Sequence, residues 1–242
     1  MSQPTSGNRI VQSLWVGSEL STMEQLSIAS FLRNGHEYHL YTYNELLNVP
    51  AGTTIKDANE ILPSSAIFQY TRRPSYAGFS NYFRYKLLVE RGGWWADSDM
   101  VCLRPFDFME EYVFSSEFAM GEEFINSGIF KAPAGSDVMS YAWRVCETKD
   151  PKAIVWGETG PRLMAAAVRE FSLEKYKQSA EVFCPIGYAD WHKVLEPEAD
   201  LRLSERTYAI HLWNERWRAA GQDKNASYSD DCLYESLKKR YL

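Results

Sequence analysis

The sequence lacks the signals of a membrane-spanning or secreted protein. No stretch of its 242 residues approaches the ~20 consecutive apolar residues that a membrane span needs. The polar start, MSQPTSGNR, has no apolar run of the kind found in secretion signals. The four cysteines, Cys102, Cys146, Cys184 and Cys232, form no close-spaced pair, so neither a zinc knuckle nor a redox pair is predicted. We therefore expect a cytoplasmic protein in a reducing compartment, at most peripherally associated with the inner face of the membrane.

Positive charge is also in short supply. Asp and Glu number 32 against 26 for Lys and Arg, which gives a formal net charge of −6. An acidic chain is a poor binder of nucleic acid, because phosphate recognition needs a basic surface. The densest basic cluster, KKR at 238–240, closes a helix-like segment, and we interpret it as cations at a helix C-terminus rather than as a membrane patch.

What is present is the pattern of one α/β domain. The length and a hydrophobic content of 45% suffice for a single core, so we expect one domain over residues 1–242, with 1–8 loose. Residues 9–17 predict a strand, 22–35 a helix and 36–43 a second strand, which is the β-α-β opening of a parallel sheet. The other expected elements are a helix over 75–93, strands over 94–97 and 100–103, two strands within 117–133, helices over 136–147 and 160–171, strands over 181–188 and 207–213, a helix from 228, and loop with a short helix over 44–63.

Two aspartates follow a short apolar strand in GGWWADSDM, residues 92–100. Side chains alternate along a strand, so Asp97 and Asp99 would point to the same side. Ligands of open α/β sheets sit beyond the carboxyl ends of the strands, which is where this strand would deliver both carboxylates. Such hard oxygen ligands select magnesium, manganese or calcium. The alternative is that both aspartates are simply turn residues.

The wider segment FSNYFRYKLLVERGGWWADSDMVCLRPF resembles the one that defines the DXD-containing sugar transferases of glycosyltransferase family 32 and their relatives. Four further pieces match in the same order: RIVQSLWVG, FINSGIFKAPAGSDVM, GETGP and HLWNERW. The resemblance implies a GT-A fold, with a mostly parallel central sheet flanked by helices. It also implies a metal-dependent, retaining glycosyltransferase that uses a sugar nucleotide.

The resemblance assigns the metal site to three residues. Asp97 would face the nucleotide ribose and reach the metal, Mn²⁺ or Mg²⁺. Asp99 would bind the metal directly, and His211 would be a third protein ligand. The alternative for His211 is a histidine satisfied within a buried strand.

Further residues would hold the nucleotide sugar. Trp15, at the end of the first strand, could stack on the base, with backbone groups of Val16 reading its edge; the alternative is a core tryptophan. Asn81 and Arg84 lie three apart on one helix face and would address the donor sugar and the diphosphate. Alternatively, Arg84 only pairs with an aspartate of the D-x-D segment. Relatives often carry Asp where this chain has Asn81, so the charge at that position is lost here.

The catalytic set is completed by two polar residues. Asn126 would hold the sugar, and Glu158 could contact sugar or acceptor. The structural alternative for Glu158 is an acid at a helix N-terminus, where negative charge is favoured. Both front-side attack and double displacement remain open for the retaining reaction.

The C-terminal aromatic segment could cover the site. Trp213 and Trp217 would close over it as a lid, and Asn214 would lie near the diphosphate. Residues 214–230 are polar and contain Gly, as mobile active-site loops often do, although a plain surface loop has the same composition.

The function that follows is transfer of a hexose from a nucleoside diphosphate sugar to a saccharide or lipid-linked saccharide acceptor. UDP is the expected nucleotide, GDP-mannose also occurs in the family, and surface polysaccharide synthesis is the expected process. Two other classes stay open: a metal-dependent phosphohydrolase or nucleotidyl-transfer enzyme, and a degenerate, non-catalytic sugar-nucleotide-binding module.

Overall fold

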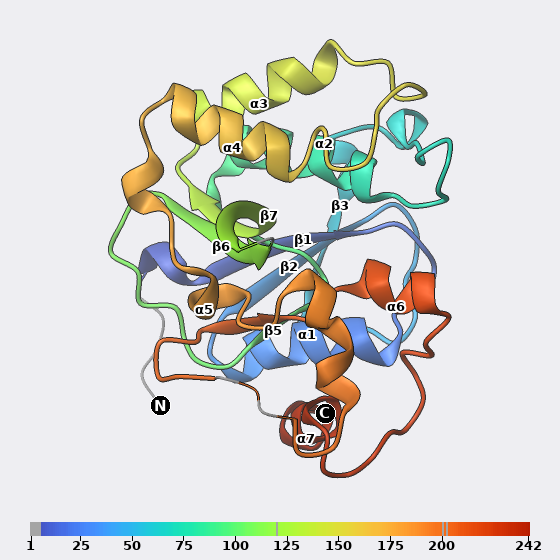
Figure 1. Cartoon of the computed structure of the whole chain (residues 1–242). Coiled ribbons are helices and arrows are strands. Elements are labelled where there is room, and N and C mark those ends of the chain that lie inside the picture. Colours follow the sequence, from blue (N-terminus) through green and yellow to red (C-terminus); the bar gives the residue numbers. More distant parts are fainter. Residues whose placement is uncertain (1–5, 120, 200, 202) are drawn as a thin grey trace.

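A six-stranded sheet with helices on both faces forms the centre of the molecule (Figure 1). The computed structural model describes residues 6–119, 121–199, 201 and 203–242. The strand order is β3-β2-β1-β4-β7-β6, and only β7 runs against its neighbours β4 and β6. The strands are β1 (Ile10–Trp15), β2 (Glu37–Thr42), β3 (Thr54–Asp57), β4 (Gly93–Ala96), β6 (Val113–Ala119) and β7 (Glu122–Ala132). The predicted α/β class with a mostly parallel sheet is confirmed.

Helices cover the sheet in two layers. On one face lie α2 (Ala77–Arg91), α3 (Asp137–Glu147) and α4 (Pro161–Glu170). The other face carries α1 (Thr22–Arg33), α7 (Leu233–Tyr241) and a two-stranded sheet of β5 (Met100–Cys102) and β8 (Ala209–His211). Two short helices, α5 (Ala180–Phe183) and α6 (Asn214–Ala220), complete the helices that the structure describes.

The central strand β4 supplies both halves of the core. Trp94 packs into the cluster on the α1 side, and its neighbour Trp95 packs into the cluster on the α2 side. Both side chains are fully buried. This is the period-two alternation of a strand buried on both faces, which explains why GWWA reads as an unbroken apolar run.

The β-α-β opening is formed as predicted. β1 and β2 pair in parallel from Ile10 with Glu37 to Trp15 with Thr42. The connecting helix α1 begins after Ser21, whose backbone N–H donates to Glu24 Oε2 at 2.9 Å. That bond satisfies one of the free donors at the helix start and fixes where the helix begins.

Several sequence-based assignments are wrong. The strand expected over 181–188 is the short helix α5, which follows Ser179 and ends before Pro185. The segment 44–63 contains the edge strand β3, whose exposed residues give it no apolar pattern. The last helix begins at Leu233 and not at residue 228. Of the segment expected to be loose, residues 1–5 lie outside the described residues, but Ser6–Asn8 form a 3₁₀ turn with Asn8 buried.

No helix within the described part of the chain has both the length and the apolar character to cross a bilayer.

Candidate active site

A cavity of about 900 Å³ opens at the carboxyl ends of β1 and β4. Its wall is built from the loops that follow these strands, the first turns of α2, the β6–β7 hairpin, the loop before α4 and the segment after β8. Ten of the residues selected from the sequence line it: Trp15, Val16, Asn81, Arg84, Asp97, Asp99, Asn126, His211, Trp213 and Asn214. A volume of this size is typical of sites for small molecules and cofactors.

The D-x-D segment is a turn that leaves the main sheet. β4 ends at Ala96, and the carbonyl of Asp97 accepts the backbone N–H of Met100 at 3.1 Å. The chain then enters β5, which pairs with β8 in the small sheet. The two carboxylates therefore reach the cavity through a turn, and not through strand alternation as expected. The two interpretations of these aspartates, as turn residues and as metal ligands, are therefore compatible, because the turn brings both carboxylates to β8.

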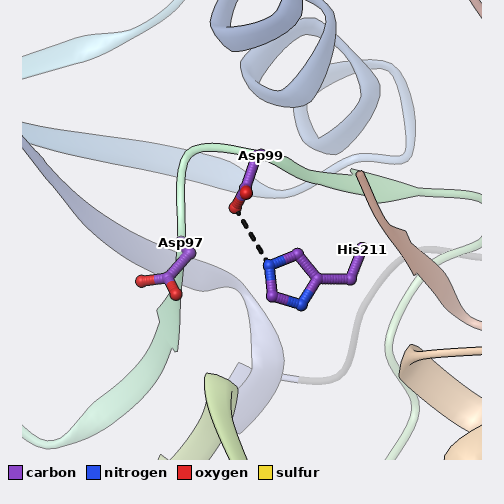
Figure 2. A group of neighbouring side chains, drawn as sticks. All are labelled: Asp97, Asp99 and His211. Carbon is purple, nitrogen blue, oxygen red and sulfur yellow. Dashed lines mark ion pairs between the residues drawn. The ribbon is translucent and has the colours of Figure 1, made fainter. Parts of the chain in front are cut away.

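Asp97, Asp99 and His211 form a cluster that fits a divalent cation (Figure 2). One ligand atom from each lies within 4.8 Å of the others, and Asp99 Oδ1 is 3.3 Å from His211 Nε2. The side chains of Asp99 and His211 are only 11% and 8% exposed. Two carboxylates and one imidazole suit manganese or magnesium, although imidazole is the softer ligand of the set.

The protonation of the cluster reflects its buried charges. Burial acts to lower the pKa of His211, but the charge of Asp99 and the bond to it raise this pKa well above its ordinary value. Burial also acts to raise the pKa of Asp99, yet His211 and the N–H of Asn214 bring it below its usual value. The pKa of Asp97 is raised by burial, against the opposing charge of Arg84. A bound cation would compete with a proton for the ring nitrogen of His211 that faces Asp99.

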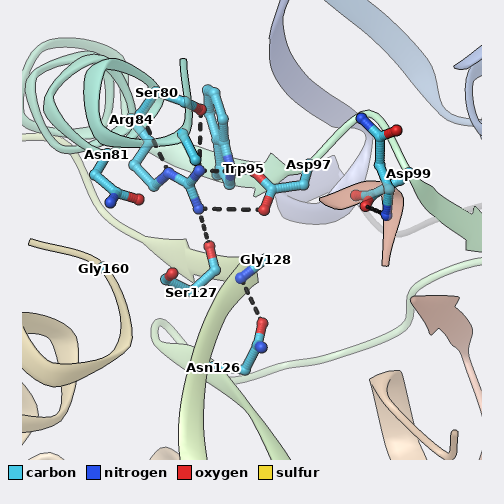
Figure 3. Close-up of polar contacts among 12 residues, drawn as sticks. Ser80, Asn81, Arg84, Trp95, Asp97, Asp99, Asn126, Ser127, Gly128 and Gly160 are labelled. Carbon is cyan, nitrogen blue, oxygen red and sulfur yellow. Dashed lines mark hydrogen bonds and ion pairs between the residues drawn. The ribbon is translucent and has the colours of Figure 1, made fainter. Parts of the chain in front are cut away.

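Arg84 is anchored beside the cluster (Figure 3). Its Nη2 lies 2.8 Å from Asp97 Oδ1, and its Nη1 donates to the same carboxylate and to the carbonyl of Ser127. Ser80 accepts from the guanidinium through its carbonyl, at 3.2 Å, and its hydroxyl, at 2.9 Å. The ring of Trp95 lies 4.8 Å below the guanidinium, and its Nε1 donates to Asp97 at 3.0 Å. The alternative considered for Arg84, pairing with an aspartate of the D-x-D segment, is thus present, and Arg84 also lines the cavity, so its role at the diphosphate stays a prediction.

Asn81 faces the start of α4. Its Nδ2 donates to Thr159 Oγ1 at 3.3 Å. The close approach depends on Gly160, because a Cβ there would lie 3.1 Å from Asn81 Nδ2 and 3.4 Å from Ser127 Oγ. An aspartate at position 81 would keep the bond to the Thr159 hydroxyl but would add a buried negative charge near Asp97.

Asn126 is fixed in one orientation by two bonds. Its Oδ1 accepts the N–H of Gly128 at 2.6 Å, and its Nδ2 donates to Glu117 Oε1 at 3.1 Å. A Cβ on Gly128 would lie 2.8 Å from Asn126 Oδ1 and 3.0 Å from His211 Cε1, so the amide lies beside the histidine. Glu117 also lines the cavity and was not selected from the sequence. Its strand, VFSSEFA, carries no motif, and only the pairing of β6 with β7 brings Glu117 to the site.

Trp15 lines the cavity at the end of β1. The ring is partly buried and packs against the α1-side core, while Nε1 donates to the carbonyl of Glu19 at 3.0 Å. Lys224 Nζ lies 5.6 Å from the ring centroid. Trp15 is therefore both a core residue and part of the cavity wall. Its stacking on the nucleotide base stays a prediction.

Of the two tryptophans expected to form a lid, Trp213 is part of the cavity wall and Trp217 is not. Trp213 stacks on His211 with 3.7 Å between ring centroids, and its Nε1 donates to the carbonyl of Ile186 at 2.8 Å. Trp217 is fully buried and donates to the carbonyl of Leu212, so it lies too deep to close over the cavity. The expected loop over 214–230 begins as the helix α6, because Trp213 adopts a left-handed conformation with φ 60° that turns the chain into it.

Glu158 lies outside the lining of this cavity. Its carboxylate pairs with Lys149 Nζ at 2.7 Å and accepts the N–H of Val155 at 3.1 Å. The bond from Lys149 lowers the pKa of Glu158. The side chain thus orders the loop before α4, close to the structural alternative considered for it.

A second group of cavity residues carries no signal in the sequence. The ring of Trp156 packs on Tyr70, with centroids 5.1 Å apart, and the guanidinium of Arg73 lies 4.8 Å from it. Arg73 also reaches Glu215 on α6, at 3.2 Å. Tyr70, Arg73 and Trp156 belong to loops without periodicity, so spacing alone could not identify them.

Comparison with known proteins gives two family matches on this chain. Residues 21–117, which include the D-x-D segment, match the family described as "Glycosyltransferase sugar-binding region containing DXD motif". Residues 150–241, which include His211, match "Alpha 1,4-glycosyltransferase conserved region".

Individual relatives agree with these matches. An alpha-1,4-N-acetylglucosaminyltransferase from Homo sapiens is 23% identical over 65% of this chain and 51% of its own length. A lactosylceramide 4-alpha-galactosyltransferase from Rattus norvegicus is 29% identical over 36% of this chain and 27% of its own. The chain thus spans about half the length of the first of these relatives.

A solved structure supports the fold. The PaToxG glycosyltransferase superposes with a TM-score of 0.53 at 12% identity, covering 96% of this chain and 87% of its own. The chain is thus similar to glycosyltransferases in two regions, the DXD-containing sugar-binding region and the alpha-1,4-glycosyltransferase region, and residues of both regions line this one cavity.

Proposed function

We propose that the protein transfers a hexose from a nucleoside diphosphate sugar, most readily a UDP-sugar, to a saccharide or glycolipid acceptor with retention of configuration. One observation carries the proposal: Asp97, Asp99 and His211 bring ligand atoms within 4.8 Å of one another in a cavity of about 900 Å³. Arg84 stands beside them, 2.8 Å from Asp97. The family matches support a sugar transferase over other metal-dependent reactions.

The charges of the cluster fit this reaction. Two carboxylates face one guanidinium, and with a neutral His211 the group keeps one net negative charge that a divalent cation would compensate. A cation held by Asp97, Asp99 and His211 would neutralise the charge that develops on the departing diphosphate. Arg84 opposes the rise that burial causes in the pKa of Asp97, and it holds this carboxylate at the cluster because its own guanidinium is fixed by Ser80 and Ser127.

The other lining residues come from three strands or helices. Trp15 ends β1 and Val16 follows it, and both would receive the base, by stacking and by backbone hydrogen bonds. Asn81 on α2 and Asn126 on β7 offer amides and would receive the sugar hydroxyls. The acceptor is proposed to be a saccharide or glycolipid of surface polysaccharide synthesis; the lactosylceramide 4-alpha-galactosyltransferase to which this chain is similar is named for a glycolipid acceptor.

Ligand-dependent thermal stability tests the proposal. The melting temperature should rise with manganese and rise further when UDP or a UDP-sugar is added, since a ligand of the folded state stabilises it by mass action. Asp99→Asn should abolish the nucleotide effect, measured as the shift in melting temperature relative to the metal-free form of the same variant. If no nucleotide stabilises the manganese-loaded protein, the proposal is wrong.

Product analysis separates transfer from hydrolysis. Incubation with UDP-sugars and saccharide acceptors should give UDP and a glycosylated acceptor, identified by mass spectrometry. Release of inorganic phosphate without any sugar transfer would instead assign a phosphohydrolase.

A further inference from the structure

Four carboxylates line the cavity, and one of them differs from the rest. Three face cationic side chains: Asp97 pairs with Arg84, Asp99 with His211, and Glu215 with Arg73 and Arg218. Within the described part of the chain, Glu117 has no cationic partner. Its one hydrogen bond there comes from a neutral amide, Asn126 Nδ2, at 3.1 Å.

The geometry leaves one oxygen of Glu117 available. The amide of Asn126 cannot rotate, because its Oδ1 already accepts the N–H of Gly128 at 2.6 Å. Its Nδ2 therefore stays on Glu117 Oε1 and holds the carboxylate at the cavity wall. Glu117 Oε2 accepts no hydrogen bond from the described residues, although an ionised carboxylate can accept several.

The position of Glu117 is close to the candidate metal cluster. Asn126 lies between Glu117 and His211, since a Cβ on Gly128 would touch both Asn126 Oδ1 and His211 Cε1. The charges of Glu117 and Asp99 both act to raise the pKa of the buried Cys184 thiol, whose Sγ is 4.0 Å from His211 Nδ1. A ligand that fills the cavity from the cluster past Asn126 would therefore also meet the Glu117 carboxylate, which lies on the neighbouring strand β6.

We propose that Glu117 binds hydroxyl groups of the sugar that is transferred and thereby determines which sugar the site accepts; this rests on the proposed function. An uncompensated carboxylate repels a diphosphate, so the phosphates belong beside Arg84 and not at this wall. A sugar ring is neutral and presents several hydroxyl donors. A carboxylate oxygen next to the Asn126 amide offers such a ring an acceptor and a donor group side by side.

Glu117→Gln is the central variant. Glutamine keeps the size and the oxygen that receives Asn126, so the hairpin should fold, but it replaces a charged acceptor by a neutral one. The expected loss in kcat/KM is roughly ten- to a hundredfold, as for loss of a hydrogen bond to a charged group. Glu122→Gln, on the same hairpin but exposed and outside the cavity lining, is the matched control and should leave kcat/KM unchanged.

Monodeoxy analogues of the accepted sugar nucleotide identify the contact. Removing the hydroxyl that meets Glu117 should cost the wild type roughly ten- to a hundredfold in kcat/KM and should cost Glu117→Gln little more. Deoxygenation at the other positions should affect both proteins equally. If the losses simply add at every position, Glu117 touches no hydroxyl of this sugar and the inference is wrong.

Hydrolysis of the sugar nucleotide in the absence of an acceptor shows whether Glu117 contacts the donor or the acceptor. Glu117→Gln should reduce this hydrolysis, because only the donor is present. A normal hydrolysis rate together with impaired transfer would move Glu117 to the acceptor and overturn the proposal. A covalent glycosyl ester trapped on Glu117 would also overturn it, because the residue would then be a nucleophile. A wild-type protein that neither transfers nor hydrolyses any sugar nucleotide would refute the proposed function itself.

Discussion

Asn214 donates its backbone N–H to Asp99 Oδ2 at 2.7 Å across 115 positions of sequence. The other oxygen of Asp99 faces His211, which lies on β8 beside Asn214. The bond is possible because Trp213 takes a left-handed conformation, φ 60° and ψ 53°, and turns the chain toward the D-x-D segment. A charge-assisted bond of this kind fixes the carboxylate before any ligand arrives.

Metal binding should depend on both ends of this arrangement. Asp99→Asn and His211→Ala should each weaken manganese binding at least about tenfold, since losing even an outer partner of a ligand costs that much. Calorimetry or the electron paramagnetic resonance signal of free manganese measures the dissociation constant without requiring activity. Glu122→Gln is the control, because this exposed acid lies outside the cluster. Unchanged affinity in both variants would show that the cluster is not the metal site.

The Arg84–Asp97 pair should contribute to stability as well as to the site. The Arg84 side chain is 4% exposed and that of Asp97 26%, so removing the guanidinium leaves a largely enclosed carboxylate without its cation. Arg84→Ala should lower the free energy of unfolding by about 3 kcal/mol. Denaturant titration measures this loss.

The double variant Arg84→Ala/Asp97→Asn tests the reason for it. Removing both charges should recover part of the loss, because the stranded carboxylate is gone. If the two single losses add, the pair is not coupled and the enclosed charge is not the cause.

Much of the site was predictable because it is encoded locally. Asp97 and Asp99 follow a strand, and Arg84 sits on the helix before it, so one continuous segment carries all three. The resemblance then located His211 far along the chain. Its approach to Asp99 depends on the pairing of Met100 with His211 in the small sheet, which no local pattern indicates.

The residues that were missed or wrongly assigned are those whose roles depend on contacts between distant segments. Glu117 reaches the cavity only through the β6–β7 register, and its strand has no motif. From the sequence, Trp217 was a plausible lid residue and Glu158 a plausible contact to sugar or acceptor. Tertiary contacts decide against both, since Trp217 is fully buried and Glu158 is held by Lys149.

Stability should fall as the medium becomes mildly acidic, because of His36. This buried side chain receives the N–H of Phe106 on Nε2 at 3.2 Å and contacts the carbonyl of Asn8 through Nδ1 at 2.9 Å, so the neutral ring fits its partners. Burial lowers the pKa of His36 to about 4, from 6.5. The unfolded chain therefore binds the proton first as pH falls.

The pH window follows from these two pKa values. The contribution of His36 is fully present above pH 6.5 and is lost as pH falls toward 4. By pH 5 about 2 kcal/mol should be gone. Denaturant titrations from pH 7.5 to 5 measure the total loss in the free energy of unfolding, and His36→Gln, which cannot titrate at this position, should lose about 2 kcal/mol less over this range than the wild type. Parallel slopes for the two proteins would refute the assignment to His36.

Gly92 joins the helix that carries Arg84 to the strand that leads to Asp97. Its backbone conformation and its surroundings tolerate only glycine. With φ 63° and ψ −165°, a Cβ would lie 2.3 Å from Ala134 N and 2.9 Å from Pro133 C, both backbone atoms. Gly92→Ala should therefore lower the free energy of unfolding by about 3 kcal/mol, from strain and overlap together.

Gly121→Ala isolates the strain, because Gly121 also has a positive φ, +86°, but nothing lies within 4 Å of its Cβ position. That control should lose only about 1 kcal/mol. Equal losses in the two variants, measured by denaturant titration, would mean that the chain at Gly92 can move away from Ala134 without cost, and that this glycine does not fix the path from α2 to the D-x-D turn.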